Sequence, residues 1–274
     1  MKLLSFLSLI FLFTSCHFEI KTINNSEDIT NSVLYSTGII LSGYQIDEDY
    51  FLSQCLNNFP SDFCYSDATS AVIQNINDQL EIGFTTKSSI FAVLKQENET
   101  LMFTAGHSCE SINKTNQNIE TLMTAFVFPG SGDKPLRIKK FIHVYDLNKT
   151  QYNLKKIIYK NQESPDICFL SIEGLFPSTI ELSHEIPQLG QKITNISTPH
   201  GIFDKQSIII FDGYYSGQKL NNHIYSIPAA PGSSGSPVLL NNKLIGIIHS
   251  TDRRFDHISY GTPLHFIQDI IDLE

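Results

Sequence analysis

Ser234 lies among small residues in the segment Pro-Gly-Ser-Ser-Gly-Ser-Pro-Val at 231–238, which leads into an apolar, strand-like run. Acyl transfer requires a nucleophilic hydroxyl on a loop whose backbone N–H groups converge on the developing oxyanion. Glycine permits such a tight arrangement because it has no Cβ to obstruct the approaching carbonyl. Ser234 is therefore a candidate nucleophile, and the N–H groups of Gly232 and Ser234 are a candidate oxyanion hole. The alternative is an ordinary turn rich in glycine and serine.

Two further segments place a histidine and an aspartate at the borders of apolar runs. His107 follows the run at 101–104 and a small-residue turn, and Asp166 directly precedes the run at 167–172. A serine nucleophile needs a base, and a histidine base needs a carboxylate to hold its tautomer and stabilise its charge. Either residue alone could be structural, but with Ser234 they form a candidate triad.

The order of these residues along the chain distinguishes between classes of hydrolase. His107 precedes Asp166 by 59 residues, and Ser234 follows another 68 residues later. The α/β-hydrolases have the order Ser, Asp or Glu, His, and their G-x-S-x-G turn would need glycine at position 236, where this chain has Ser236. We therefore exclude an α/β-hydrolase and retain the order His, Asp, Ser of the chymotrypsin type.

The elements that must position these residues are short apolar segments, which recur between turn residues from residue 81 onward. This spacing indicates an all-β sandwich or barrel. Only the C-terminus has a convincing helical pattern, with Thr262 as cap and Pro263 as first helical residue. Residues 17–80 are polar and predicted to be rich in loops, with one strand-like run at 38–41. We expect strands at 89–94, 100–104, 124–128, 138–144, 156–159, 167–172, 192–196, 207–211, 223–227, 237–240 and 244–249.

The three motifs resemble those of trypsin-like serine proteases. Leu101–Cys109 is similar to the L-T-A-x-H-C segment of that family, Asp166–Leu170 to D-I-A-L-L, and Gly232–Val238 to G-D-S-G-G-P-V. Pro187–Ile202 resembles a stretch of bacterial HtrA-like and glutamyl-endopeptidase-like enzymes. Leu244–His249 is similar to the strand that lines the specificity pocket.

The resemblance implies an all-β, chymotrypsin-like fold of two six-stranded antiparallel barrels with a C-terminal α-helix and no PDZ module. It also implies a division of the chain. We expect a signal peptide at 1–15, an N-terminal extension at 17–80, a first barrel at 81–176, a second barrel at 177–261 and a helix at 262–274.

The same resemblance implies a role for each candidate residue. Ser234 would be the nucleophile, His107 the general base and acid, and Asp166 the group that orients His107. The reaction would be peptide hydrolysis through an acyl-enzyme, acting on a protein or peptide substrate without metal or cofactor. A catalytically weak binding or adhesion module, and an esterase with the same triad, are the alternatives.

Two positions depart from the pattern of the trypsins. Ser233 stands where those enzymes carry the aspartate that pairs with a newly cut N-terminus, so we do not expect zymogen activation by that route. Ser236 replaces a glycine, as it does in glutamyl endopeptidases.

Substrate preference would depend on residues near the pocket strand. We expect His249, together with Ser250 and Pro228, to contribute to substrate binding. An imidazole at His249 could bind an acidic P1 residue, although the pocket histidine of glutamyl endopeptidases lies one residue nearer the glycine of that strand. The alternative is that His249 packs on the triad.

The composition excludes several classes of protein. The chain has 274 residues, of which 41% are hydrophobic and 17% charged, the reverse of a disordered composition. The formal net charge of −9 excludes a sequence-independent nucleic-acid binder, which needs a basic surface. This length allows one large unit or two packed halves.

The first residues are typical of a secretory signal peptide. A lysine precedes an apolar run at 3–13, and small residues lead to Cys16. The run is shorter than the roughly 20 residues that a transmembrane helix needs. Residues 12–16 also resemble a bacterial lipobox, so simple secretion and membrane attachment through a lipidated Cys16 both stay open. We expect a secreted or cell-envelope protein, of bacterial rather than eukaryotic origin.

The remaining cysteines lack the spacing of a metal site, so none is expected to bind a metal. Cys55 and Cys64 could close a short loop in an oxidising compartment. Cys168 lies in an apolar run and is expected to be a buried free thiol.

Overall fold

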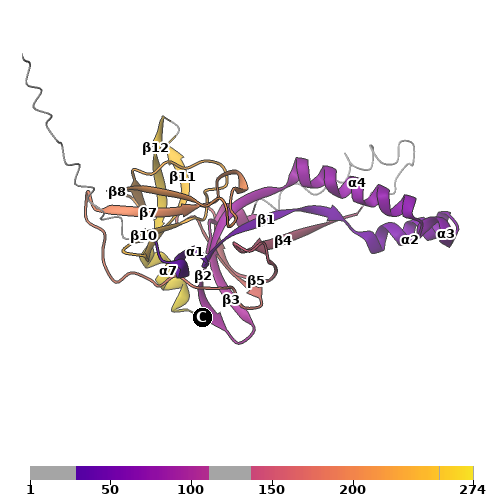
Figure 1. Ribbon diagram of the computed structural model, residues 1–274, viewed down its shortest axis with the longest axis horizontal. Helices are drawn as coiled ribbons and strands as arrows, with labels where there is room; N and C mark the ends of the chain where they lie inside the picture. Colours follow the sequence, from indigo (N-terminus) through magenta and orange to yellow (C-terminus); the bar gives the residue numbers. More distant parts are fainter. Residues whose placement is uncertain (1–28, 111–136, 253, 274) are drawn as a thin grey trace, which may run out of the picture.

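The computed structural model describes residues 29–110, 137–252 and 254–273. Two closed antiparallel barrels of six strands each lie side by side (Figure 1), which confirms the predicted architecture. The strand order is β1-β2-β3-β6-β5-β4 in the first barrel and β10-β11-β12-β9-β8-β7 in the second.

The strands of the first barrel are β1 (Thr37–Ile46), β2 (Thr86–Gln96), β3 (Glu99–Thr104), β4 (Ile138–Tyr145), β5 (Gln151–Asn161) and β6 (Ile167–Glu173). Those of the second barrel are β7 (Lys192–Ser197), β8 (Ile209–Lys219), β9 (Asn222–Tyr225), β10 (Pro237–Leu240), β11 (Lys243–Asp252) and β12 (Phe255–Pro263). The helices are α1 (Asn31–Leu34), α2 (Glu48–Asn58), α3 (Ser61–Cys64), α4 (Asp67–Phe84), α5 (Gly106–Glu110), the 3₁₀ turn η1 (Pro199–Gly201) and α7 (Leu264–Ile271).

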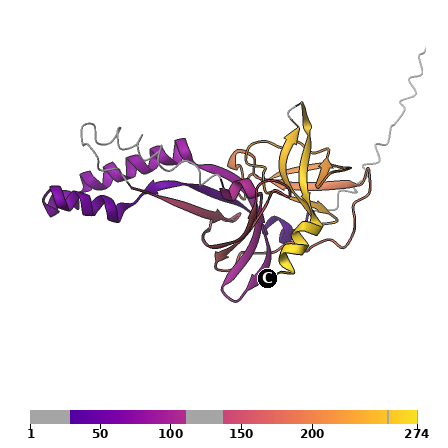
Figure 2. The same cartoon turned by 180° about the vertical axis from the view of Figure 1, so that it is seen from behind.

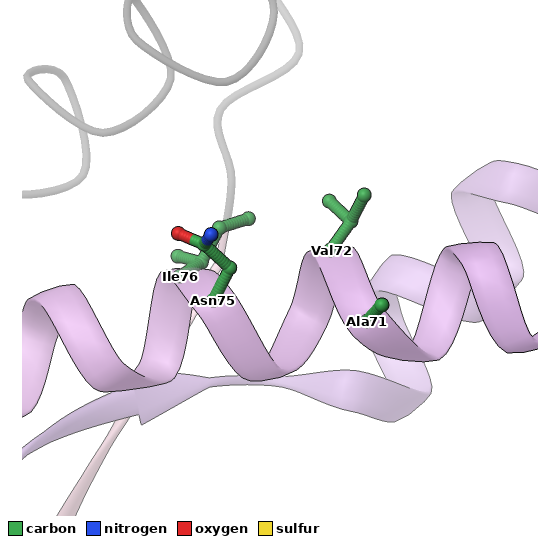
Figure 3. A pocket seen from close by; sticks show the side chains of 4 residues that line it. All are labelled: Ala71, Val72, Asn75 and Ile76. Carbon is green, nitrogen blue, oxygen red and sulfur yellow. The ribbon is translucent and has the colours of Figure 1, made fainter.

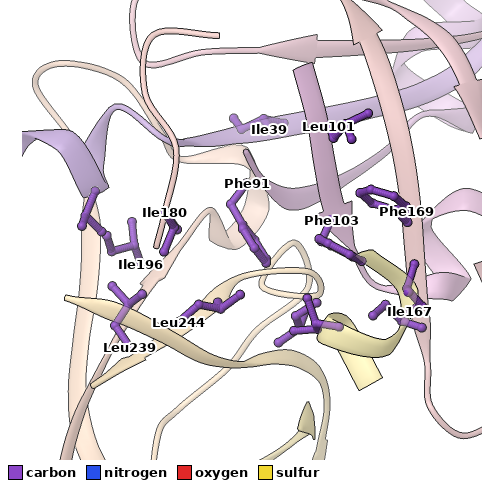
Figure 4. Packing of buried hydrophobic residues seen from close by; sticks show 14 of the residues in the cluster. Ile39, Phe91, Leu101, Phe103, Ile167, Phe169, Ile180, Ile196, Leu239 and Leu244 are labelled. Atoms are coloured by element: carbon purple, nitrogen blue, oxygen red, sulfur yellow. The ribbon is translucent and has the colours of Figure 1, made fainter. Parts of the chain in front are cut away.

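A continuous apolar cluster joins the two barrels (Figure 4). Phe91, Phe103 and Phe169 of the first barrel belong to the same cluster as Leu239 and Leu244 of the second. The rings of Phe103 and Phe169 stack with centroids 4.4 Å apart. Burial of this shared surface is the main favourable contribution to holding the two barrels together.

The alternation of side chains along β3 and β6 explains why these strands are apolar at consecutive positions. Phe103 and Phe169 face the cluster between the barrels, whereas Met102, Cys168 and Leu170 face a second cluster of the first barrel. Because successive residues of a strand point to opposite faces, a strand buried on both faces is apolar throughout. The His and Asp motifs adjoin these two strands.

The first barrel begins at Thr37 and not at residue 81, which corrects the expected boundary. β1 pairs with β2 through Thr37↔Phe91 and with β4 through Ile46↔Ile138, and so closes the barrel. Only residues 38–41 of β1 had a strand-like pattern, because polar residues and glycine follow.

One strand of the structure was not expected, and one expected strand is not tested by it. β12 was not predicted, because polar residues and glycine interrupt its few apolar residues; pairing with β11 and β9 determines it. The strand predicted at 124–128 lies outside the described residues, as do the signal peptide and Cys16.

Residues 47–84 form helices α2–α4 in an arm that projects from the first barrel (Figure 1), whereas we expected loops up to residue 80 and the first barrel from residue 81. Figure 2 shows the same projection from behind. Asp47 caps α2 by accepting the N–H of Tyr50 at 3.3 Å, and Ser66 caps α4 by accepting that of Thr69 at 3.3 Å. These caps satisfy helix N–H groups that would otherwise lack a partner. Few side chains of the arm are buried and its polar composition favoured loops, although α4 buries Thr69, Ile73 and Ile76 at helical spacing.

The Cys55–Cys64 disulfide, one of the pairings that the sequence allows, joins α2 to α3. It confirms that these two cysteines close a short loop.

A hollow on the arm is lined by Ala71, Val72, Asn75 and Ile76 of α4 (Figure 3). None of these side chains can ionise or act as a nucleophile, and the hollow lies on α4 rather than on the strands that adjoin His107, Asp166 and Ser234. Within the described ranges, no helix has both the length and the apolar character to cross a membrane.

The C-terminal helix α7 begins at Leu264 and buries Ile267 and Ile270 against the barrels. Its N-cap is Pro263, and no side chain caps it. The expected cap, Thr262, is instead the penultimate residue of β12, and its hydroxyl donates to the carbonyl oxygen of Asp166 at 3.0 Å. The cap prediction was wrong because Thr262 satisfies a long-range acceptor.

His223 is a buried titratable group of the second barrel. Its side chain packs against Tyr215 and Tyr225, with Nδ1 3.1 Å from the Tyr225 hydroxyl. Burial and, to a lesser extent, the charge of His265 lower its pKa to about 4.

We expect the free energy of unfolding to fall as the pH drops from about 6.5 to about 4. The unfolded chain takes up a proton near pH 6.5, whereas the buried ring of His223 resists it until about pH 4. The difference corresponds to roughly 3 kcal/mol at full effect. Urea unfolding at a series of pH values should show this slope, and His223→Gln should reduce it. An unchanged slope in the variant would contradict the assignment.

Candidate active site

His107 lies in the single-turn helix α5, directly after β3. The preceding Gly106 passes close to the first barrel: a Cβ there would overlap the carbonyl oxygen of Asn161 and approach Oδ1 of Asp166 to 2.8 Å. Glycine is required here because any side chain would push α5 away from Asp166.

Asp166 sits immediately before β6 and binds His107 twice. Its Oδ1 accepts the backbone N–H of His107 at 3.0 Å, and its Oδ2 lies 2.7 Å from Nδ1 of the ring. An ionised carboxylate can only accept, so Nδ1 is the donor and Nε2 is left to accept a proton. The His107 side chain is 42% exposed and that of Asp166 10% exposed, so the ring is accessible and its partner is sheltered.

The loop that carries Ser234 is held through its carbonyl oxygens. Gly232 O accepts from the hydroxyls of Ser89 at 2.9 Å and Thr198 at 3.2 Å. The carbonyl oxygen of Pro231 accepts the N–H of His200 at 2.7 Å, and that of Ser234 accepts the N–H of Ser89 at 2.8 Å.

Two N–H groups of this loop differ from its carbonyl oxygens in their hydrogen bonding. No acceptor among the described residues binds the N–H of Gly232 or of Ser234. Gly232 has a φ of +98°, which L-residues with a side chain rarely adopt. The loop thus presents two unpaired donors beside the candidate nucleophile, as an oxyanion hole requires.

Ser89 connects the serine loop to the histidine. It donates to two carbonyls of the loop, and its own carbonyl accepts the Thr104 hydroxyl at 2.7 Å, three residues before His107. A Cβ on Gly235 would lie only 3.0 Å from the backbone nitrogen of Ala105. The two motifs therefore lie against each other. The Ser234 hydroxyl itself donates to the carbonyl oxygen of His249 at 3.4 Å, and no hydrogen bond joins it to His107.

His249 occupies a bulge in β11, where the register with β12 shifts between Ile248 and Ser250. Bulges re-aim side chains next to functional sites. Its Nε2 lies 3.1 Å from Oδ1 of Asn222. Burial lowers the pKa of His249; the nearby charge of Asp166 opposes this shift and that of His107 adds to it. The ring is thus close to the candidate pair and neutral near pH 7, and a role in binding an acidic P1 residue stays a prediction.

The other two predicted substrate-binding residues lie near this strand. Ser250 is exposed on β11 opposite Tyr260, and Pro228 is partly buried between β9 and the serine loop.

Cys168 is not the free thiol that the sequence suggested, because it forms a disulfide with Cys109. β3 and β6 pair through Thr104↔Cys168, so α5, which follows β3, passes over the start of β6. The partner could not be identified from the sequence because it depends on this register.

Sequence reasoning missed the residues that hold the site together: Ser89, Thr198, Asn222 and Thr262. Each acts through a contact with a residue far along the chain. Ser89 and Thr198 also bond each other at 3.0 Å. Thr198 lies in the segment 187–202 that resembles bacterial proteases, but nothing in that segment indicates its contact with the serine loop. Thr262 was identified only as a helix cap, and Ser89 and Asn222 lie in no recognisable motif. Within the described part of the chain, no group of three or more His, Cys, Asp or Glu side chains could hold a metal ion.

Comparison with known proteins identifies the architecture. No family profile and no curated protein sequence matches the chain. Its structure is similar to the Rv3671c protease from M. tuberculosis in its active form, with a TM-score of 0.52, 11% identity, and coverage of 89% of this chain and 84% of that one. The fold is chymotrypsin-like.

The serine endoprotease from Yersinia pestis is also similar, with a TM-score of 0.51 and 14% identity over 85% of this chain. This chain spans 61% of that protein's length. At such identities the likeness concerns the chymotrypsin-like fold alone.

Proposed function

We propose that this chain is a serine endopeptidase that hydrolyses peptide bonds through an acyl-enzyme on Ser234. The observation that carries the proposal is the doubly bonded His107–Asp166 pair beside a serine loop with two unpaired N–H donors. This combination supplies a base of defined tautomer and a site for an oxyanion.

In the proposed reaction, Nε2 of His107 takes the Ser234 hydroxyl proton while Oγ attacks the peptide carbonyl carbon. Asp166 stabilises the resulting imidazolium. The oxyanion of the tetrahedral intermediate accepts the N–H groups of Gly232 and Ser234, each worth about 2.7–4 kcal/mol. His107 then gives its proton to the leaving amine, the C–N bond breaks, and water releases the acyl group by the reverse proton transfers.

The serine loop of this enzyme would not need to pair with a newly cut N-terminus in order to adopt its active conformation. Ser233, at the position of the trypsin aspartate, is buried, and its hydroxyl accepts the N–H of Ala230 at 3.1 Å. The Ser233 N–H also donates to the carbonyl oxygen of Ala230 at 2.8 Å. These local bonds support a loop that reaches its active form without an ion pair.

The proposal also includes the type of peptidase, its location and its substrates. The motifs favour a trypsin-like peptidase of the HtrA-like or glutamyl-endopeptidase-like type. The protein would be secreted or held in the bacterial cell envelope, with Cys16 as a candidate site of lipid attachment and peptides or proteins as substrates.

Covalent labelling tests the proposal directly. A fluorophosphonate should label the chain expressed as residues 17–274, because the probe reacts with an activated serine. Ser234→Ala should abolish labelling and peptide hydrolysis, while Ser236→Ala, two residues away, should retain labelling. A wild-type chain that does not react would indicate a binding module. Labelling with cleavage of esters but not of peptides would indicate an esterase.

A further inference from the structure

The Cys109–Cys168 disulfide joins the same two segments of the chain as the His107–Asp166 pair. Each cysteine lies two residues after one member of the pair, and both pairs are separated by 59 residues in the sequence. The covalent link therefore joins the same two elements as the hydrogen bonds: α5 and the start of β6.

Among the described residues, helix α5 is held by packing on β6, β5 and β2, by hydrogen bonds and by the disulfide. It is five residues long, too short to be stable without tertiary contacts. The backbone bond to Asp166 holds His107, and the Ser108 hydroxyl donates to that of Ser88 at 2.9 Å. Within the described residues, the disulfide is the one covalent tie between α5 and the barrel.

The two cysteines are enclosed by the first barrel. Cys109 is 2% exposed and Cys168 fully buried, and both pack in the cluster with Met102 and Leu170. Thus Cys109 attaches α5 to the barrel core through Cys168, while His107, two residues earlier in the chain than Cys109, contacts Asp166 through its N–H and its ring.

We propose that the Cys109–Cys168 disulfide positions His107 against Asp166, and that its reduction lowers turnover while both barrels stay folded. This inference rests on the proposed function. A displacement of about 1 Å at a reacting group costs about 100-fold in rate. Without the link, α5 retains only hydrogen bonds and apolar contacts, so His107 samples positions from which Nε2 cannot take the serine proton.

The redox step requires a dithiol such as dithiothreitol. One of its thiolates attacks a cysteine sulfur, the S–S bond breaks, and a mixed disulfide forms. The second thiol of the reagent then attacks the reagent's own sulfur in the mixed disulfide, and the second cysteine is released as a thiol. Two electrons and two protons pass to the protein, giving two cysteine thiols and the cyclic disulfide of the reagent. Because both sulfurs are buried, exchange follows local opening of α5.

The chain contains a matched control for the experiment. Cys55–Cys64 is a disulfide on the arm, joining α2 to α3 away from the serine loop (Figure 1). We would compare Cys109→Ala/Cys168→Ala with Cys55→Ala/Cys64→Ala in the 17–274 chain. Measurements are kcat and KM on a peptide substrate, circular dichroism, and the downfield NMR proton of the His107 Nδ1–H bond to Asp166.

For Cys109→Ala/Cys168→Ala we expect kcat to fall 10- to 100-fold with KM within twofold. The native circular dichroism should persist, and the downfield proton should exchange faster or disappear. Cys55→Ala/Cys64→Ala should keep kcat and the proton signal. A purely structural disulfide would lower the melting temperature but leave kcat of the folded protein within twofold, which would overturn the proposal. An equal loss in both variants would do the same.

Reduction of an intact chain covers the case in which the double variant does not fold. The Cys55→Ala/Cys64→Ala protein is titrated with dithiothreitol, and free thiols, activity and circular dichroism are followed together. Activity should fall in step with the appearance of two thiols and return on reoxidation. Full activity with two thiols titrated would overturn the proposal. If the wild type reacts with no fluorophosphonate, the proposed function fails, and the NMR proton still tests the positioning role.

Discussion

Asp166→Asn is expected to lower kcat roughly 10⁴-fold, because it reverses the tautomer of His107. The asparagine oxygen can still accept the backbone N–H that Oδ1 accepts at 3.0 Å. Its amide nitrogen can only donate, so the ring atom 2.7 Å from Oδ2 must become an acceptor. Nε2 then carries the proton and can no longer take one from Ser234.

Steady-state kinetics on a peptide substrate and the rate of fluorophosphonate labelling would measure this loss. Asp146→Asn is the matched control: Asp146 is also buried, and it accepts the N–H groups of Asn148 and Thr150 in the turn before β5. It should lower stability without changing kcat. Equal kcat values for Asp166→Asn and wild type would remove Asp166 from the reaction.

Gly232→Ala is expected to lower kcat by about 10²- to 10³-fold with little change in KM, the cost of losing one oxyanion donor. A Cβ at this position would lie 2.6 Å from the carbonyl oxygen of Thr198 and 2.8 Å from the nitrogen of His200. The loop must move, and the N–H of Gly232 moves with it. The ground-state substrate makes little use of this donor, so KM should be spared.

A variant at a second glycine distinguishes the effect of this steric clash from the effect of placing alanine at a positive φ. Gly174 has a φ of +93°, close to that of Gly232, but a Cβ there would meet nothing nearer than 3.7 Å. Gly174→Ala should therefore lower the melting temperature and leave kcat unchanged. The oxyanion assignment fails if the two variants have the same kcat.

The candidate site could be located from the sequence because His107, Asp166 and Ser234 each adjoin an apolar strand. β3, β6 and β10 are buried on both faces, so they stand out as continuous apolar runs. The runs and the small-residue turns beside them are local properties, and a sequence displays local properties directly.

The contacts that support the site could not be found in the same way. Ser89 reaches Gly232, and Thr262 reaches the carbonyl of Asp166, only because the two barrels pack together. The Cys109–Cys168 link depends on the register of β3 against β6. These are consequences of tertiary structure, and no residue pattern near Ser89, Thr262 or Cys109 records them.

The arm was missed for another reason. Its helices bury few side chains, and those that α4 buries at helical spacing lie in a mostly polar segment; capping by Asp47 and Ser66 supplies part of the definition of the helices. A polar segment between two barrel strands is typical of a loop as well as of an exposed helix.

The place where the arm joins the barrel makes it a natural insertion. Ser42 and Thr86 are partners in the β1–β2 register, and their hydroxyls are 2.6 Å apart. β1 runs on to Ile46, paired with β4, before the arm begins, so the chain leaves the barrel a few residues beyond the point to which it returns at Thr86. Segments with neighbouring ends can be lengthened, shortened or exchanged with little strain on the scaffold. The arm can therefore change in sequence and length while the strand pairing of the barrel that carries His107 and Asp166 stays the same.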